Sequence, residues 1–328
     1  MSGERPIARD RAVLIYSEHA GHSAALTHAE SQLAAAGISV AERIEVGALP
    51  ATTAQGPIWR DAGIGLAIGA GGDGTLGTVA THLLGSDLAL GILPMGTSND
   101  VARSLGIPLD IAAAVRVLRE GEPTVVDAGQ VVSEAGASLS PVFLHVLALG
   151  LNVEFARLAT SVVTRREFGR LSYAVSSVEA LGTFEPVETR LHLSGCPEDQ
   201  ASDLTLTVMQ VAVVNTPVFG GSLELRVPGI SVRDQTLDVL VFEVIEPADL
   251  RQMVETLMEF IRGGNHELRI PGMHRLRCKE LLIETTPSVE LTLDGELRSR
   301  TPATVRVAPQ GVPIMLPRSA HTAKTTGE

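Results

Sequence analysis

Aromatic residues and cysteines are both scarce in this chain. Aromatic side chains make up 3% of the sequence, whereas hydrophobic residues as a whole make up 45%. Leucine, valine, isoleucine and alanine must therefore line most of the core and any pockets. The only two cysteines, Cys196 and Cys278, lie far apart and form no Cys-x-x-Cys pair. They supply no metal site and fit a reducing cytoplasm, where we expect the protein to be located.

Positive charge is also in short supply. The formal net charge is -12, and Lys279 and Lys324 are the only lysines. We therefore expect no nucleic-acid partner, and any cation that binds phosphate should be an arginine. One local cluster, Arg165, Arg166 and Arg170, precedes an amphipathic segment. It is either a solvated face or a contact with a phospholipid surface.

Several common signatures are missing. No apolar run reaches the ~18 residues of a membrane span, so we expect no transmembrane segment. The N-terminus has only a short apolar run, which is typical of a first strand and not of a signal peptide. There is no Walker A loop and no Gly-x-Ser-x-Gly elbow, and the nine histidines lack metal-site spacing. Function has to be sought in other motifs.

The first 127 residues alternate between strand and helix patterns. Apolar runs predict strands at 12–16, 38–44, 63–70 and 88–93. Helices are predicted between and after them, the last with Asp110 as its N-cap and Gly121 at its end. This alternation predicts an α/β domain with a parallel sheet, whose ligand loops lie at the carboxyl ends of the strands.

The residues after Asp127 have a different character. Extended apolar runs lie at 141–151, 204–215, 237–245, 280–286, 289–296 and 303–309. Helical patterns at 168–184 and 246–264 interrupt them. We expect a β-rich second domain over 128–309, and we expect the polar tail, 319–328, to be disordered.

A glycine-rich stretch, GAGGDGTLGTVATHLLG at 69–85, places Asp73 among glycines just before a helix. Gly69, Gly71 and Gly74 match the Gly-x-Gly-x-x-Gly dinucleotide fingerprint, but the match follows the third strand and not the first. A carboxylate here repels a pyrophosphate unless a metal ion or a sugar hydroxyl lies between them. An ordinary Rossmann site is therefore disfavoured.

A second strand–turn–helix unit, ALGILPMGTSNDVARSLGIP, follows at 89–108. Thr97, Ser98 and Asn99 can each cap its helix, but capping uses only one of them. Two adjacent strands that both end in such loops build one cleft. That cleft offers backbone N–H groups to phosphates and carboxylates to Mg²⁺.

Together these segments resemble the diacylglycerol kinase catalytic family, specifically its bacterial soluble lipid kinases. The resemblance rests on GGDGTL (71–76) and LPMGTSNDVARSLGIP (93–108). It continues in VDAG (126–129), FLHVLALGLNVEFAR (143–157), FGRLSYAVSSVEAL (168–181), VVNTPVFGGSLELRVPGISVRDQTLDVLVF (213–242) and LTLDGE (291–296). It implies an α/β nucleotide-binding domain over 1–127, a β-sandwich-like second domain, and a C-terminal segment, 310–318, that returns to the first domain.

The resemblance also implies a reaction, in which ATP and Mg²⁺ serve phosphoryl transfer to a lipid hydroxyl. In this family the glycine-rich loop holds the ATP phosphates, and its acid serves metal and nucleotide. The corresponding residues here are Gly71, Gly72, Asp73, Gly74, Thr75, Leu76 and Gly77. Gly21 and Thr97 are implied to contact the nucleotide. Asp100 is implied to assist metal or phosphate positioning.

Glu296 of LTLDGE matches the family's general base, which takes the proton from the lipid hydroxyl. The alternative from the residues alone is an ordinary hairpin turn, because Asp-Gly is a common turn pair. The family's structural Mg²⁺ would correspond here to Asp234, with the carbonyls of Ser231 and Thr236 beside it and Asp127 connected through water.

Three departures from the family pattern keep other interpretations open. The first loop reads YSEHAG (16–21), Glu45 stands where the family has a threonine, and Gln235 stands where glycine is usual. A φ above zero at Gln235 would cost roughly 1 kcal/mol. The alternatives are an NAD kinase-like enzyme and a non-catalytic nucleotide- or lipid-binding homologue. The expected partner is a lipid at a membrane surface, contacted transiently, and a homodimer is left open.

Overall fold

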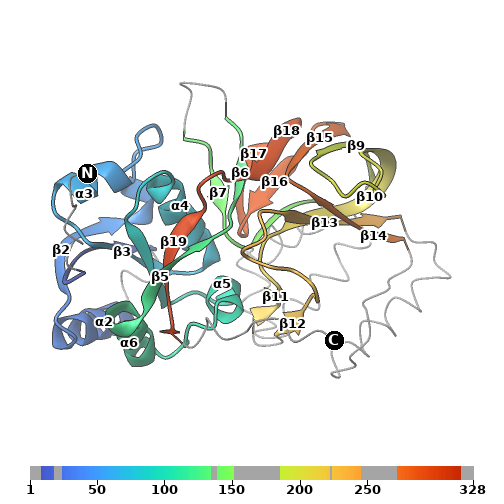
Figure 1. Cartoon of the computed structure of the whole chain (residues 1–328). Coiled ribbons are helices and arrows are strands. Elements are labelled where there is room, and N and C mark those ends of the chain that lie inside the picture. Colours follow the sequence, from blue (N-terminus) through green and yellow to red (C-terminus); the bar gives the residue numbers. More distant parts are fainter. Residues whose placement is uncertain are drawn as a thin grey trace, which may run out of the picture.

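The structure is a computed structural model that describes residues 9–17, 24–133, 139–150, 185–221, 224–244 and 272–318. Within these ranges the chain forms two main sheets, which lie side by side in Figure 1. Some sequence-based expectations concern residues outside the described ranges: Gly21, the arginines 165, 166 and 170, the helices at 168–184 and 246–264, and the tail 319–328.

The first sheet has six strands in the order β2-β1-β3-β4-β19-β5. They are β1 (Arg11–Tyr16), β2 (Ser39–Glu45), β3 (Leu66–Gly71), β4 (Ala89–Pro94), β5 (Glu122–Val126) and β19 (Val312–Leu316). Neighbours from β2 to β19 are parallel, and β5 runs antiparallel to β19. The parallel α/β sheet predicted from the alternation is thus confirmed. Its fifth strand in sheet order, β19, comes from near the end of the chain.

Helices cover this sheet on both sides. They are α2 (Ala24–Ala35), α3 (Gly56–Asp61), α4 (Asp73–Leu83), α5 (Asp100–Ser104) and α6 (Ile111–Glu120), with a short 3-10 helix η1 (Val46–Ala48). Helices α2 and α6 pack on each other below the sheet in Figure 1, and α3 and α4 lie above it. Every residue of β3 and β4 is buried as a result, which explains why these strands appear as unbroken apolar runs.

The sequence placed Asp73 just before a helix, but the helix starts one residue earlier than that. Helix α4 begins at Asp73, directly after Gly72, so Asp73, Gly74 and Thr75 form its first turn. The glycine-rich loop is therefore short, and most of the motif lies on the N-terminal end of a helix. The Asp110 cap is confirmed, since the carboxylate accepts a hydrogen bond from Ala113 N–H at 2.9 Å.

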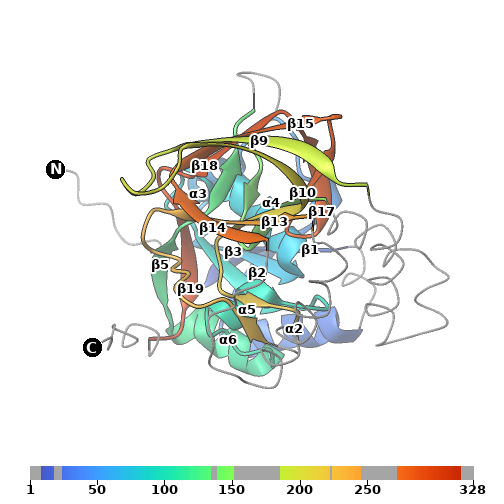
Figure 2. The same cartoon turned by 90° about the vertical axis from the view of Figure 1, so that its right-hand side faces the viewer.

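The second sheet has 11 strands and is antiparallel. They are β6 (Gly129–Val131), β7 (Val142–Phe143), β8 (Val146–Gly150), β9 (Val187–Ser194), β10 (Asp203–Val214), β13 (Leu237–Glu243), β14 (Met273–Cys278), β15 (Glu280–Thr286), β16 (Glu290–Leu293), β17 (Glu296–Arg300) and β18 (Ala303–Val307). A two-stranded ribbon, β11 (Val218–Phe219) with β12 (Leu225–Arg226), lies beside α5. Seen from its own side in Figure 2, the large sheet curls around one apolar core. The β-sandwich-like second domain is confirmed.

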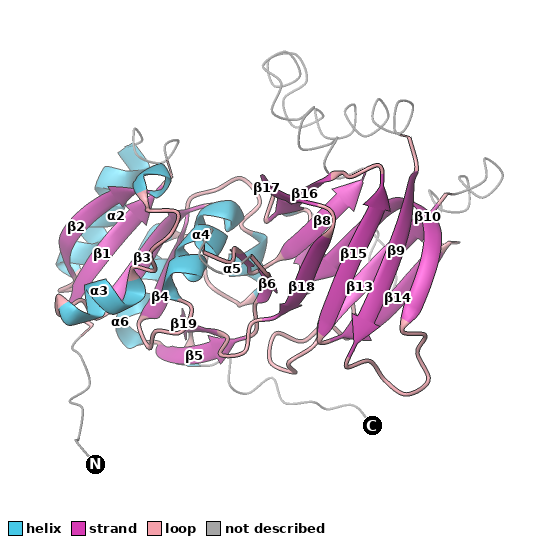
Figure 3. Ribbon diagram, turned by 90° about the horizontal axis from the view of Figure 1, so that it is seen from above, coloured by secondary structure: helices cyan, strands magenta, loops and turns pink. Residues whose placement is uncertain are grey.

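The two domains share their border. Ala128, Val142 and Leu144 belong to the core of the first sheet although they precede or lie among second-domain strands. Figure 3 shows α4 and α5 on the side of the first domain that faces the second sheet, close to β6 and β17. No helix among the described residues is long and apolar enough to cross a membrane.

Candidate active site

The two motif loops meet at the carboxyl ends of β3 and β4. Met95 N–H donates to Gly71 C=O at 3.0 Å. A methyl group added at Gly96 would lie 2.3 Å from the Cα of Gly72, so the two backbones touch. Gly96 has no room for a side chain, and a methyl group at Gly72 would lie a tight 3.3 Å from the Cα of Gly96. The loops therefore form one continuous surface, as the sequence predicts for adjacent strand ends.

Asp73 joins the two loops. Its carboxylate accepts hydrogen bonds from the backbone N–H groups of Asp100 at 3.1 Å and Val101 at 2.9 Å, which are the first residues of α5. Burial raises the pKa of Asp73 above its ordinary value, although these two bonds lower it. A side chain from the first loop thus caps the helix of the second loop.

This arrangement corrects the predicted cap of α5. Asn99 occupies the N-cap position in the left-handed conformation, φ 53°, without a side-chain bond to the helix. Its amide instead braces its own loop, because Oδ1 accepts from Gly96 N–H and Nδ2 donates to Gly96 C=O, both at 2.9 Å. With Asp73 already on the helix N–H groups, the loop residues are not needed as caps.

Asp100 connects the second loop to the second domain. Its carboxylate accepts from Gly221 N–H at 2.8 Å and lies 3.7 Å from Nε2 of His145. Burial raises the pKa of Asp100 to about 6, and the nearby Asp73 carboxylate adds to this rise. Burial also lowers the pKa of His145 to about 3, so this histidine is neutral. Its Nδ1 lies 2.7 Å from Thr216 Oγ1.

Asp294 is a buried polar centre in the second domain. Its carboxylate accepts three backbone hydrogen bonds at 2.9 Å, from Leu144, His145 and Val146. Burial raises the pKa of Asp294 to about 7 despite these bonds. These bonds fix the turn between β16 and β17 against the start of β8.

The Asp294–Gly295 pair does form the expected tight hairpin turn. Leu293 pairs with Glu296 across it, and both turn residues have positive φ, 49° and 86°. The turn places Glu296 against the first turn of α4. A methyl group added at Gly74 would lie 2.4 Å from Glu296 Oε1, and one at Gly77 would lie 2.7 Å from Asp294 Oδ2. Two glycines of the motif thus make room for two carboxylates of the other domain.

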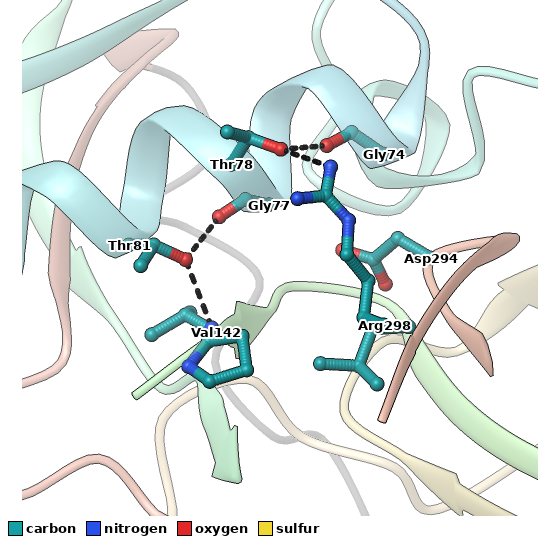
Figure 4. Close-up of a pocket in the computed structure, with 9 residues that line it drawn as sticks. Gly74, Gly77, Thr78, Thr81, Val142, Asp294 and Arg298 are labelled. Atoms are coloured by element: carbon teal, nitrogen blue, oxygen red, sulfur yellow. Dashed lines mark hydrogen bonds between the residues drawn. The ribbon is translucent and has the colours of Figure 1, made fainter. Parts of the chain in front are cut away.

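Arg298 extends this contact. On β17 it lies on the same side as Glu296, because alternate residues of a strand share a face. Its guanidinium forms an ion pair with Glu296 and donates to Thr78 Oγ1 on α4 at 2.7 Å. Figure 4 shows Arg298 and Asp294 reaching α4 from the same side. Further along the helix, the Thr81 hydroxyl accepts from Val142 N–H at 2.9 Å.

The remaining residues expected at the site differ in exposure. Leu76 is 1% exposed within the first core, and the Thr75 side chain is buried against Gly71. Thr97 is exposed at the second loop, where a ligand can reach it.

The expected structural metal site already has protein partners. Asp127 accepts from the backbone N–H of Gln235 and from its side-chain Nε2, both at 2.7 Å. Asp234 forms an ion pair with Arg277 and accepts from Thr236 N–H at 3.2 Å. Within the described residues no group of three or more acidic, histidine or cysteine side chains is placed to hold a metal. With the Arg277 guanidinium on Asp234 and the Gln235 amide on Asp127, these two carboxylates as arranged do not fit a resident cation.

Asp294 and Arg298 were not predicted as parts of the site. Asp294 was considered only as a turn residue, and its three backbone donors lie 148 to 150 residues away in the chain. Arg298 follows Glu296 by two residues, and that spacing on a strand was the one available signal.

Comparison with known proteins agrees with this architecture. Residues 11–131 match the "Diacylglycerol kinase catalytic domain", and residues 145–316 match the "YegS C-terminal NAD kinase beta sandwich-like domain". A "Diacylglycerol kinase" of Mycobacterium tuberculosis is 29% identical over 251 residues, covering 76% of this chain and 75% of that protein. A "Probable lipid kinase YegS-like" of Klebsiella pneumoniae is 35% identical over 244 residues, covering 72% and 77%.

A solved structure shows the same fold. The crystal structure of a diacylglycerol kinase from Bacillus anthracis str. Sterne superposes with a TM-score of 0.64 at 21% identity, covering 94% of this chain and 98% of that one. The fold and the domain matches define a kinase, a phosphotransferase with an alcohol group as acceptor. Within that class the chain belongs to the diacylglycerol kinase catalytic family, the family of diacylglycerol kinases and YegS-like lipid kinases.

Proposed function

We propose that this protein transfers the γ-phosphate of ATP to the hydroxyl of a lipid, diacylglycerol or a related molecule, with Glu296 as the general base. One observation carries the proposal. The β16–β17 hairpin brings Glu296 of the second domain against Gly74, in the first turn of α4, beside the two joined loops.

The start of α4 suits a nucleotide triphosphate. The first backbone N–H groups of an α-helix have no partner inside the helix, and the helix dipole favours negative charge there. Gly72, Asp73 and Gly74 at this end of the helix are partly exposed. Gly71 and Gly72 of the first loop and Thr97 of the second are the residues that we propose next to the phosphates.

Asp73 is the residue that we propose to hold Mg²⁺ together with the nucleotide. Mg²⁺ commonly binds through one or two carboxylates together with substrate phosphates. Each oxygen of Asp73 accepts one backbone hydrogen bond, and a carboxylate has further lone pairs to offer. Burial raises the pKa values of Asp100 and Asp294, and the nearby Asp73 carboxylate adds to both rises, so a cation at Asp73 would relieve the repulsion among these three carboxylates. The ion would supply that charge.

The chemistry follows from the placement of Glu296. Its carboxylate accepts the proton of the lipid hydroxyl while that oxygen bonds to the γ-phosphorus, and the bond from the γ-phosphorus to the bridging oxygen breaks. ADP and a phosphorylated lipid leave, and the proton then passes to water. Arg298 is a positioning residue in this scheme, since its ion pair with Glu296 and its bond to Thr78 hold the carboxylate at α4.

The test combines a lipid panel with substitution of the base. Purified protein, labelled ATP and Mg²⁺ are incubated with diacylglycerol, phosphatidylglycerol or a long-chain amino alcohol in detergent micelles. We expect one lipid product, and we expect Glu296→Gln to abolish turnover, typically 10²–10⁴-fold for a general base, while ATP still binds. An unchanged rate in this variant contradicts the assignment of the base.

Two other outcomes decide against the proposal as a whole. Robust conversion of NAD to NADP would indicate an NAD kinase-like activity. Binding of nucleotide or lipid without any phosphorylated product would indicate a homologue that has lost turnover, for which the changed first loop and Glu45 are the motivating residues.

A further inference from the structure

The loop 231–236, which precedes β13, links the two domains. Val232 C=O accepts from Asp127 N–H at 2.8 Å, and Val232 packs against the core of the first sheet. Asp127 lies between β5 of the first sheet and β6 of the second, and it is 2% exposed. Asn215 Nδ2 donates to Asp127 C=O at 2.8 Å from the end of β10. Asp127 is thus one point at which the second domain is attached to the first.

Gln235 holds this loop with a two-pronged contact. Its backbone N–H and its side-chain amide each donate to a different oxygen of Asp127, both at 2.7 Å. The residue adopts φ 58°, the left-handed conformation that ordinarily favours glycine. A glycine would relieve the backbone but could make only the first of the two bonds. The amide therefore offsets the conformational cost by satisfying a buried carboxylate.

Positive charge at the loop comes from β14. Arg277 forms an ion pair with Asp234, and its Nε lies 3.6 Å from Asp238 Oδ1. Arg275 donates to Asp238 through Nε at 3.1 Å and Nη2 at 2.8 Å. Asp238 is 1% exposed, and burial raises its pKa although the two arginines lower it. Two guanidinium groups therefore already stand beside these carboxylates, and they repel a further cation.

We infer that this protein holds the 231–236 loop with its own side chains, the Gln235 amide and the Arg277 guanidinium, in place of a structural divalent cation. The inference concerns this loop alone and not the metal proposed at Asp73. It predicts a domain linkage that does not depend on metal ions. All its readouts are independent of kinase activity, so it can fail or succeed separately from the proposed function.

The test measures metal content and thermal unfolding of the full chain without nucleotide. Protein passed through EDTA and a desalting column is analysed for Mg, Ca, Mn and Zn by mass spectrometry, and is then melted in EDTA or in Mg²⁺. We expect well under one ion per chain and no change in Tm. A resident ion at 100 times its dissociation constant would raise the Tm by about 4 °C or more.

Variants locate any ion that does bind. A Mg²⁺-dependent rise in Tm that disappears in Asp234→Asn or Asp127→Asn overturns the inference, and so does about one tightly held ion per chain. A rise that persists in both variants places the ion elsewhere and supports it. The double variant Gln235→Gly/Arg277→Ala should melt lower in EDTA and should gain a Mg²⁺-dependent shift. Arg300→Ala is the matched control, because this exposed arginine pairs with Glu290 far from the loop. If the double variant does not fold, the metal content and the Tm of the wild-type chain still test whether the loop holds a cation.

Discussion

The contact between Gly74 and Glu296 leads to a sharp prediction for Gly74→Ala. The new methyl group would lie 2.4 Å from Glu296 Oε1, 2.7 Å from Cδ and 2.8 Å from Cγ. These distances are far below van der Waals contact, so one partner must move by about 1 Å. The backbone of α4 is fixed by its helix, whereas the Glu296 side chain is 44% exposed and can turn toward solvent at the cost of its exposed ion pair with Arg298. The carboxylate should therefore be displaced.

Gly74→Ala should change stability little but should lower activity strongly. Alanine in place of glycine within a helix stabilises by about 0.5–1 kcal/mol, which offsets the small cost of moving an exposed side chain. Stability should stay within about 1 kcal/mol of the parent protein. A displacement of about 1 Å at a reacting group can lower the rate by 10²-fold, so kcat should fall by about that factor.

The assay is steady-state lipid phosphorylation, measured beside urea unfolding of the same preparation. Gly77→Ala is the matched comparison, because its methyl group would meet Asp294 Oδ2 at 2.7 Å and Val142 C=O at 3.1 Å. Those groups are buried and fixed, so this variant should lose about 1–3 kcal/mol of stability. In the Glu296→Gln background, Gly74→Ala should have no further effect. An unaltered kcat for Gly74→Ala, or an equal loss in that background, refutes the reasoning.

Three further predictions concern the charged groups of the site. Removing the cap in Asp73→Ala should cost about 0.5–2 kcal/mol in urea unfolding, with a larger loss than Asp73→Asn, whose remaining oxygen can still accept one bond. Arg298→Gln should lower kcat while leaving the KM for ATP within about twofold. Arg298→Lys should restore part of the rate, because lysine keeps the positive charge but not the paired N–H donors of the guanidinium. Equal rates for both variants would contradict the positioning role of Arg298. The pKa of Asp100 is raised to about 6 in the folded protein, so the native state binds more protons than the unfolded chain between about pH 4 and pH 6. This contribution to stability is therefore greatest at low pH and is lost as the pH rises through 6. Asp100→Asn should reduce the difference in the free energy of unfolding between pH 4.5 and pH 7.5. An unchanged difference would contradict the raised pKa of Asp100.

Local patterns predicted the framework of the first domain well. Apolar runs located β1, β3 and β4 to within a few residues, because buried parallel strands need continuous apolar sequence. The Asp110 cap and the Asp-Gly turn were also predicted, since each depends on interactions within three residues. Extended apolar runs predicted the β-rich second domain, and the family resemblance implied its sandwich-like form.

The site itself depends on contacts that no local pattern encodes. Asp73 caps a helix that starts 27 residues later, and Gln235 satisfies a carboxylate 108 residues earlier. Glycines of the motif were interpreted as room for phosphates, yet Gly74 and Gly77 make room for Glu296 and Asp294. Such space can be recognised only when both domains are seen together.

The place of β19 has a consequence for synthesis on the ribosome. The strand lies between β4 and β5, yet it is made after every strand of the second domain. Until Leu316 has emerged, the N-terminal half has an open slot at its sheet, with unpaired backbone on both sides. The two halves cannot mature one after the other like separate modules, and a shortened chain that ends before Val312 should be captured by chaperones or aggregate.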